Sequence, residues 1–301
     1  MKIFITGGTG FIGQTLVNKL KEAGHELSLL SRSVHGSRSF GEKVRWIEGD
    51  PTWPGAWQEE AARSEAIINL AGASIFSRWN EQGKQKILES RVSTTRHLAE
   101  AVAGSTQPPQ AFLNASAVGY YGFRNDEEID ETGTPGDDFL ARVCQAWEAE
   151  TLQVTAAGSR VALMRFGIVL GRRGGALNQM LPLFRLGLGG RLGKGTQWFS
   201  WIHLTDLVRS ISFILNHPEA HGPINLTAPN PVTNTELTRV LGRVLHRPAV
   251  LPVPSFMIKM VLGEFGSVLL QGQRVQPVKL QSLGFDFRFS FIDQALKDLL
   301  G

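Results

Sequence analysis

Three glycines stand three residues apart near the start of the chain, in the segment TGGTGFIG. A β-branched run precedes them and a helical pattern follows, which is the context of the dinucleotide fingerprint. The first glycine permits a tight turn, the second lets a pyrophosphate approach the backbone, and the third lets helix and strand pack closely, with free N–H groups at the helix start facing the phosphates. The alternative is a glycine-rich turn without a ligand. The residues expected to bind phosphate are Gly7, Thr9, Gly10, Phe11, Ile12 and Gly13.

The end of the second predicted strand indicates which dinucleotide would bind. An NAD site usually has a carboxylate there to accept from the ribose 2′-hydroxyl. This chain instead has Ser31, Arg32 and Ser33, with Arg38 shortly after. A guanidinium and a hydroxyl suit a 2′-phosphate, so we expect NADP rather than NAD, bound through Ser31 and Arg32. A solvated loop arginine is the alternative.

The elements that must position these residues alternate along the first half of the chain. Short apolar runs such as KIFITG, AIINLAG and AFLNASAVGYYG are separated by helical patterns, the longest being NEQGKQKILESRVSTTRHLAEAVAG. This alternation of strand and helix patterns predicts an α/β fold with a doubly wound parallel sheet. After about residue 171 the sequence becomes rich in glycine and aromatic residues. We therefore predict a nucleotide-binding domain over residues 1–170, to which the chain returns at about 201–230, and a smaller, interleaved α+β domain over 171–301.

Several segments together resemble the extended short-chain dehydrogenase/reductase superfamily. They are TGGTGFIG, NLAG, NASAVGYYG and WIHLTDLV. RWNEQGKQKILESRVSTT, LPLFRLGLGG and GKGTQWFSWIH narrow the resemblance to the YfcH-like "epimerase family" proteins, whose C-terminal domain has no assigned role. The resemblance covers nearly the whole chain. It implies a Rossmann-type NADP-binding domain followed by a substrate domain.

The resemblance also implies further cofactor contacts. Strand ends would bring backbone groups to the adenosine, pyrophosphate and nicotinamide. An arginine on the long helix would lie near the cofactor; the alternative for this arginine is a plain ion pair on the surface. Asp50 stands where many relatives hold the adenine edge. The further cofactor residues expected on this basis are Leu70, Ala71, Gly72, Arg91, Ala115, Gly167 and Ile168.

The proton-transfer pair of the superfamily is missing from this chain. Its active members use Tyr-x-x-x-Lys on a helix, in which the lysine and the oxidised nicotinamide lower the pKa of the tyrosine from about 10. The only tyrosines here are Tyr120 and Tyr121, and neither is followed by a lysine four residues on. In the family register, Phe139 falls at the tyrosine and Val143 at the lysine.

Three residues remain as catalytic candidates. Ser116 occupies the place of the serine that orients the reacting oxygen, and Tyr120 and Tyr121 follow it, with Arg142 or Arg165 as nearby cations. The alternative is that one tyrosine packs into the sheet edge while the other binds substrate. His203 is expected to fix a loop, with Asp206 as its partner, rather than to act as a base.

The composition limits other kinds of function. The net charge of +4 and the pI of about 9.4 are mildly basic, but the charges are scattered, so we expect no nucleic-acid partner. The one cysteine, Cys144, allows no internal disulfide and reads as a buried helix residue. No apolar run is long enough to span a bilayer. We expect a cytoplasmic protein, a possible homodimer, with no metal and no membrane partner.

Two functions follow from these observations. The first is an NADP-dependent oxidoreductase or epimerase with an atypical active site, acting on a small polar or sugar-like substrate. Trp79, Trp198, Phe199 and Trp201, with Arg185, Gln197 and the pair Gly189–Gly190, could surround such a ligand, although aromatic residues are more often core. The second is a non-catalytic NADPH-binding sensor or scaffold module, which the loss of the Tyr/Lys pair favours.

Overall fold

The computed structural model describes residues 1–33, 40, 44–76 and 79–301, and its centre is a parallel β-sheet. Seven strands lie in the order β11-β7-β5-β4-β1-β2-β3, and every neighbouring pair runs parallel. The predicted doubly wound α/β fold is therefore confirmed. The strands are β1 (Lys2–Thr6), β2 (Glu26–Ser31), β3 (Val44–Glu48), β4 (Ala66–Asn69), β5 (Ala111–Ala117), β7 (Arg160–Phe166) and β11 (Gly222–Leu226).

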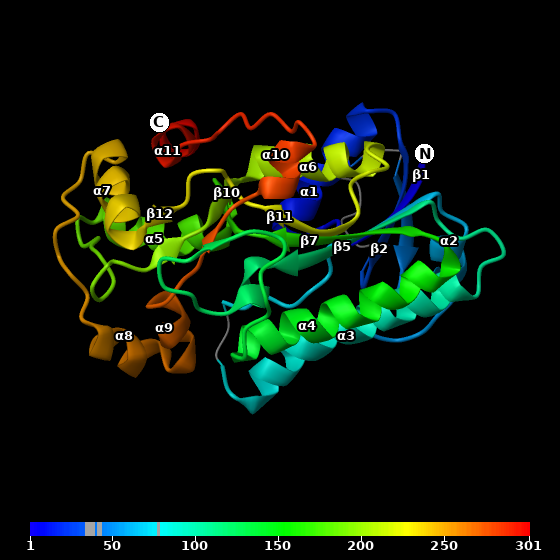
Figure 1. Ribbon diagram of the computed structural model, residues 1–301, viewed down its shortest axis with the longest axis horizontal. Coiled ribbons are helices and arrows are strands. Elements are labelled where there is room, and N and C mark those ends of the chain that lie inside the picture. The colour runs from blue at the N-terminus through cyan, green and yellow to red at the C-terminus, as the bar shows by residue number, and fades with distance from the viewer. Residues whose placement is uncertain (34–39, 41–43, 77–78) are drawn as a thin grey trace.

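Helices cover both faces of this sheet (Figure 1). The long helix α3 (Glu81–Ala103) begins at Asn80, whose side chain accepts from the Gly83 N–H, and it lies beside α4 (Phe139–Leu152) on one face. The opposite face carries α1 (Phe11–Glu22) and α6 (Leu204–Asn216). Side chains of one strand alternate between these faces, so that Ile3 and Ile5 pack with α1 while Phe4 packs with α3.

The chain after β7 adds smaller elements, which gather at one end of the sheet (Figure 1). Leu170, Leu177, Trp201, Leu241 and Leu296 belong to a second hydrophobic core there. The remaining elements of the whole chain, four of which precede β7, are α2 (Trp57–Ala62), η2 (Val118–Tyr121), β6 (Glu128–Ile129), η3 (Gln153–Ala157), β8 (Ile168–Gly171), α5 (Gly175–Arg185), β9 (Trp198–Phe199), β10 (Trp201–His203), β12 (Val232–Thr233), α7 (Asn234–Val244), α8 (Ser255–Leu262), α9 (Glu264–Leu269), β13 (Arg274–Val275), α10 (Val278–Ser282) and α11 (Ile292–Leu300). No described helix is both long and apolar enough to cross a bilayer.

The strand order has a switch point at the middle of the sheet, and the region beyond the strand ends there is called the crevice below. From β1 the chain moves outward through β2 to β3, and then returns to β4 on the other side of β1. The connections from β1 and from β4 therefore leave the sheet in opposite directions. In open α/β sheets, ligands bind at such a switch point, beyond the carboxyl ends of the strands.

His203 and Asp206 anchor the start of α6, but not as a pair with each other. His203 Nδ1 accepts from the Thr205 N–H at 3.0 Å, and its ring stacks on Phe289. Asp206 is fully buried and accepts from the N–H groups of Arg288 and Phe289 at 3.1 and 2.8 Å. The expected structural role of His203 agrees with this geometry, while its expected partner is wrong: Asp206 fixes the C-terminal segment instead.

Candidate functional site

The turn between β1 and α1 leaves backbone N–H groups open at the crevice. Gly7 has a φ of 70°, which favours glycine, and its carbonyl accepts from the Gly10 N–H at 3.0 Å. A Cβ on Gly13 would lie 2.2 Å from the Gly7 oxygen, so only glycine allows this helix to approach the strand. Gly10 caps α1 without a side-chain hydrogen bond, and no acidic residue occupies the first turn. The start of α1 therefore has the chemistry of an anion site.

Polar side chains at the ends of β1 and β4 and in the middle of β5 fix the floor of the crevice. The Thr6 hydroxyl donates to Asn69 Oδ1 at 2.5 Å, and Asn69 Nδ2 donates to Asn114 Oδ1 at 2.6 Å and to the Thr95 hydroxyl at 2.9 Å. All four side chains are buried. Asn69 Oδ1 also accepts from the Ala71 N–H, which orients the backbone of Leu70–Gly72 above the strand.

Arg91 lies against this loop from α3. Its guanidinium carbon is 3.1 Å from the position of a Cβ on Gly72 and 5.2 Å from the centre of the Trp147 ring. Its Nη1 donates to the Ile87 carbonyl at 2.9 Å, and burial lowers the pKa of Arg91. No carboxylate forms an ion pair with it within the described part of the chain, so the surface ion pair considered above is not found. A half-buried cation without a counter-ion suits an anionic ligand.

Arg32 lies at the other side of the crevice, at the end of β2. It is exposed, and its positive charge reaches Asp50 after β3. Burial opposes ionisation of Asp50, but hydrogen bonds from Thr52 and the charge of Arg32 lower its pKa below the ordinary value. The Ser31 hydroxyl donates to the Ser33 carbonyl at 2.8 Å. Arg38, the second arginine of the prediction, is outside the described residues.

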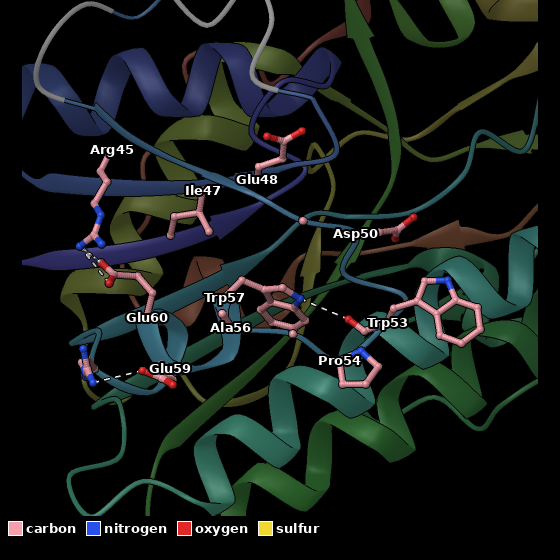
Figure 2. A pocket seen from close by; sticks show the side chains of 13 residues that line it. Arg45, Ile47, Glu48, Asp50, Trp53, Pro54, Ala56, Trp57, Glu59 and Glu60 are labelled. Carbon is pink, nitrogen blue, oxygen red and sulfur yellow. Dashed lines mark hydrogen bonds and ion pairs between the residues drawn. The ribbon is translucent and has the colours of Figure 1, made fainter.

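A hollow of about 400 Å³ lies between β3 and α2 (Figure 2). Its charges are compensated, because Arg45 pairs with Glu60 at 3.0 Å and Arg63 with Glu59 at 3.3 Å. The Trp57 indole N–H donates to the Trp53 carbonyl across its floor. This hollow therefore lacks the free positive charge found around the βα turn.

Comparison with known proteins agrees with the fold. The model of the NAD dependent epimerase/dehydratase family matches residues 3–227. The chain belongs to this family. A domain of unknown function, DUF1731, matches residues 253–299. Among solved structures, the chain is similar to the human epimerase family protein SDR39U1, crystallised with NADPH, with a TM-score of 0.86, 36% identity, and coverage of 100% of this chain and 99% of that one.

Curated relatives show the same likeness. The epimerase family protein SDR39U1 homolog, chloroplastic, of Arabidopsis thaliana is 41% identical over 309 residues, covering 100% of this chain and 87% of the relative. The epimerase family protein YfhF of Bacillus subtilis is 38% identical, covering 100% of this chain and 98% of the relative. The resemblance drawn from the sequence motifs is thus confirmed, including the C-terminal domain.

A buried ion pair occupies the region where the family's acid–base chemistry would be expected. Arg165 on β7 donates to Glu148 on α4 through Nε at 2.9 Å and Nη2 at 2.8 Å. Glu148 Oε1 also accepts from the Ser116 hydroxyl at 2.6 Å. Arg165 Nη1 donates to the Tyr121 hydroxyl at 3.0 Å, which in turn donates to Asn225 Oδ1 at 2.6 Å. These five residues form one network across β5, η2, α4, β7 and β11.

This network determines what the two tyrosines can do. Tyr121 is fully buried with both sides of its hydroxyl bonded, and burial raises its pKa to about 12 despite the opposing charge of Arg165. Ser116 is likewise committed to Glu148. The geometry thus favours structural roles for both, and their catalytic role stays a prediction. Tyr120 is half-buried, and its ring lies 3.5 Å from the Arg165 guanidinium carbon.

Phe139 and Val143 confirm that the first turns of α4 carry no proton-transfer pair. Val143 is buried, whereas Phe139 packs edge-on against Trp79 with ring centres 5.1 Å apart. Phe265 on α9 joins the same cluster, 5.5 Å from Trp79. Lys84 Nζ lies 5.3 Å from the Phe139 ring centre and pairs with Glu264 at 2.5 Å. Aromatic surface thus replaces the tyrosine–lysine pair at this place.

The remaining predicted cofactor residues lie at strand ends. Ala115 is a buried residue of β5. The N–H groups of Gly167 and Ile168 donate to the carbonyls of Leu226 and Ser200, at 3.0 and 2.8 Å. These two donors are therefore bonded within the protein and leave no N–H for a nicotinamide carboxamide. Phe11 contributes its backbone to the turn, while its ring packs toward Gly171 and Gly174.

The aromatic residues expected to surround one ligand are distributed over separate places. Trp201 is fully buried and donates to the Asn230 carbonyl at 3.0 Å, so it is a core residue. The Trp198 indole N–H donates to Asp126 at 2.8 Å, whereas the Trp79 ring packs against Phe139. Cys144 is buried as expected, and burial raises its pKa to about 12.

Replacing Glu148 with Gln should strongly destabilise the fold. The variant leaves the Arg165 guanidinium buried without a counter-charge, a change that typically costs about 3–5 kcal/mol. The matched control is Glu150→Gln on the same helix, whose partner Arg96 has a half-exposed side chain. That control should lose less than about 1 kcal/mol. Equal losses in urea unfolding would contradict the importance of the buried pair.

Burial should make Tyr121 ionise only in strongly alkaline solution, because its pKa is about 12 in the folded protein. Because the unfolded pKa is about 10, Tyr121 contributes stability that is present below pH 10 and is lost as the pH rises toward 12. Tyrosinate absorbance of Tyr120→Phe measures this, because Tyr121 is then the one tyrosine in the chain. An ionisation near pH 10 in that folded variant would contradict the raised pKa of Tyr121.

Proposed function

We propose that this protein binds NADPH in the crevice between the ends of β1 and β4. The observation that carries the proposal is Arg91, a half-buried cation without a carboxylate partner in the described structure, held against Gly72 beside the open start of α1. The residues present fit a dinucleotide, since Gly13 lets the open start of α1 lie close against the turn after β1. The NADPH in the crystal structure of the human relative supports the same cofactor here.

Each side of the crevice has a proposed role. Backbone N–H groups of residues 9–13 and the Arg91 guanidinium bind the pyrophosphate, and Leu70–Gly72 line its path. Arg32 and Ser31 take the 2′-phosphate, while Asp50 holds Arg32 by its charge. The Arg32 side chain is the group that favours NADP over NAD, since a carboxylate is needed for a free 2′-hydroxyl.

The reaction that this site supports is hydride transfer to or from a small polar or sugar-like substrate. When bound, the nicotinamide supplies the hydride chemistry. The chain's own contribution is a proton at Tyr120, beside which Arg165 provides positive charge at 3.5 Å from the ring centre. The aromatic surface of Trp79, Phe139 and Phe265 excludes water at this end of the crevice.

A second candidate function is NADPH binding without turnover. The network that immobilises Ser116 and Tyr121 favours it, because both residues then serve the fold rather than a substrate. In that case the protein is a sensor or scaffold whose state depends on bound NADPH.

Replacing Arg32 with Gln tests the cofactor assignment. The variant should weaken NADPH binding by about 1.5–3 kcal/mol, the range for hydrogen bonds to charged groups, and leave NADH binding unchanged. Fluorescence titration with both cofactors measures this. Arg63→Gln, which removes an exposed arginine just after α2, should change neither affinity. Equal weakening of NADPH and NADH by Arg32→Gln would show that the 2′-phosphate lies elsewhere.

Replacing Tyr120 with Phe separates the two candidate functions. If Tyr120 supplies the proton, kcat for NADPH-dependent reduction of carbonyl compounds should fall about 100-fold or more, with NADPH affinity retained. An unchanged kcat would remove Tyr120 from the reaction. Tight NADPH binding by the unmodified protein, with no oxidation over prolonged incubation with varied carbonyl compounds, would favour the sensor.

A further inference from the structure

Exposed apolar side chains gather at one end of the molecule. Of the fifteen large apolar side chains exposed within the described part of the chain, ten belong to residues 183–188 and 250–262. Monomeric soluble proteins rarely expose contiguous patches of this kind unless they bind something. The ten are Leu183, Leu186, Leu188, Val250, Leu251, Phe256, Met257, Met260, Val261 and Leu262.

Helix α8 contributes the most prominent of these side chains. Phe256 and Met260 are four residues apart, as are Met257 and Val261, so the four share one side of the helix. Phe256, Met260 and Val261 are 69%, 74% and 74% exposed. Ile258, on the opposite side, is the buried residue of α8 and attaches it to the protein. The apolar side of this helix therefore points into solvent.

Positive charge surrounds the apolar residues. A hollow of about 830 Å³ beside α7 is lined by four arginines and His246, with no acidic residue among its lining. The segments 183–194 and 236–262 hold seven cations and one carboxylate, Glu236. The cations are Arg185, Arg191, Lys194, Arg239, Arg243, Arg247 and Lys259.

Contacts join these segments into one surface, which we call the basic apolar end. Arg247 Nε donates to the Arg185 carbonyl at 3.1 Å, and the Gly193 N–H donates to the Val253 carbonyl at 2.9 Å. Val250 itself lines the arginine hollow. In Figure 1, α5, α7 and α8 lie together at the end of the molecule away from β2 and α2.

We propose that the basic apolar end binds the surface of an anionic lipid bilayer. Exposed Phe, Leu, Met and Val with arginine and lysine around them form the pattern of a peripheral membrane site, in which apolar side chains enter the headgroup boundary and cations contact anionic lipids. A second copy of the chain fits less well, because a two-fold contact would oppose seven cations with seven more. A soluble polyanion would satisfy the arginines but leave the apolar side chains in water.

Vesicle co-sedimentation with the full chain tests this proposal. The protein should sediment with vesicles containing about 30% phosphatidylglycerol and stay in solution with pure phosphatidylcholine, and binding should weaken with salt. Arg239→Gln with Arg243→Gln should lower the partition coefficient about 30-fold, since each cation near the surface contributes about 1 kcal/mol. Met260→Gln with Val261→Gln should lower it at least tenfold.

Matched controls keep the outcome interpretable. Arg63→Gln and Leu152→Gln change an exposed cation and an exposed apolar residue elsewhere on the surface, and should bind vesicles like the unmodified protein. NADPH titration and thermal unfolding verify that each variant is folded. No sedimentation with anionic vesicles, or binding that the four substitutions leave unchanged, would overturn the proposal. So would a dimer in light scattering that Met260→Gln with Val261→Gln abolishes, or pyrophosphate binding at the arginines without vesicle binding.

Discussion

The ion pair between Arg165 and Glu148 is the interaction on which the interior of this protein depends. Both side chains are almost fully buried, at 3% and 6% exposure, so neither charge can be satisfied by water. The pair ties β7 to α4, and its remaining hydrogen-bonding capacity reaches Ser116 and Tyr121. Two charges in the interior are stable only with such complete bonding. The network therefore holds these residues in one arrangement, and a free acid or base does not arise among them.

The crevice differs, because the start of α1 has no side-chain cap. Gly7 and Gly13 bring β1 and α1 so close that no side chain fits between them. Arg91 adds a positive charge that no carboxylate of the described residues pairs with. Free N–H groups and an uncompensated cation lower the stability of the protein alone, and a bound polyphosphate would recover that free energy. Thr6, Asn69 and Asn114 keep the floor rigid beneath them.

The sequence predicted the sheet and the crevice because their determinants are local. The glycine spacing and the apolar and helical patterns each act within a few residues, and they predicted β1, the start of α1 and the long helix α3. Glu148 was missed, although its position next to Trp147 on the buried side of α4 signals a carboxylate inside the protein. Pairings over longer separations were not predictable, since Tyr121 meets Asn225 across 104 residues. The charged residues are scattered along the sequence, so it did not predict that folding gathers seven cations at the basic apolar end.

The domain of unknown function connects the basic apolar end to Trp79 through the short helices α8 and α9. A Cβ on Gly266 of α9 would lie 2.6 Å from the Ile258 carbonyl of α8, so the two helices pack with almost no space between their backbones. On α9, Phe265 contacts Trp79 and Glu264 pairs with Lys84 at the start of α3. On α8, the apolar side points away from the protein. Because α8 and α9 form one closely packed unit, the orientation of the exposed side of α8 is fixed relative to the aromatic cluster of Trp79, Phe139 and Phe265.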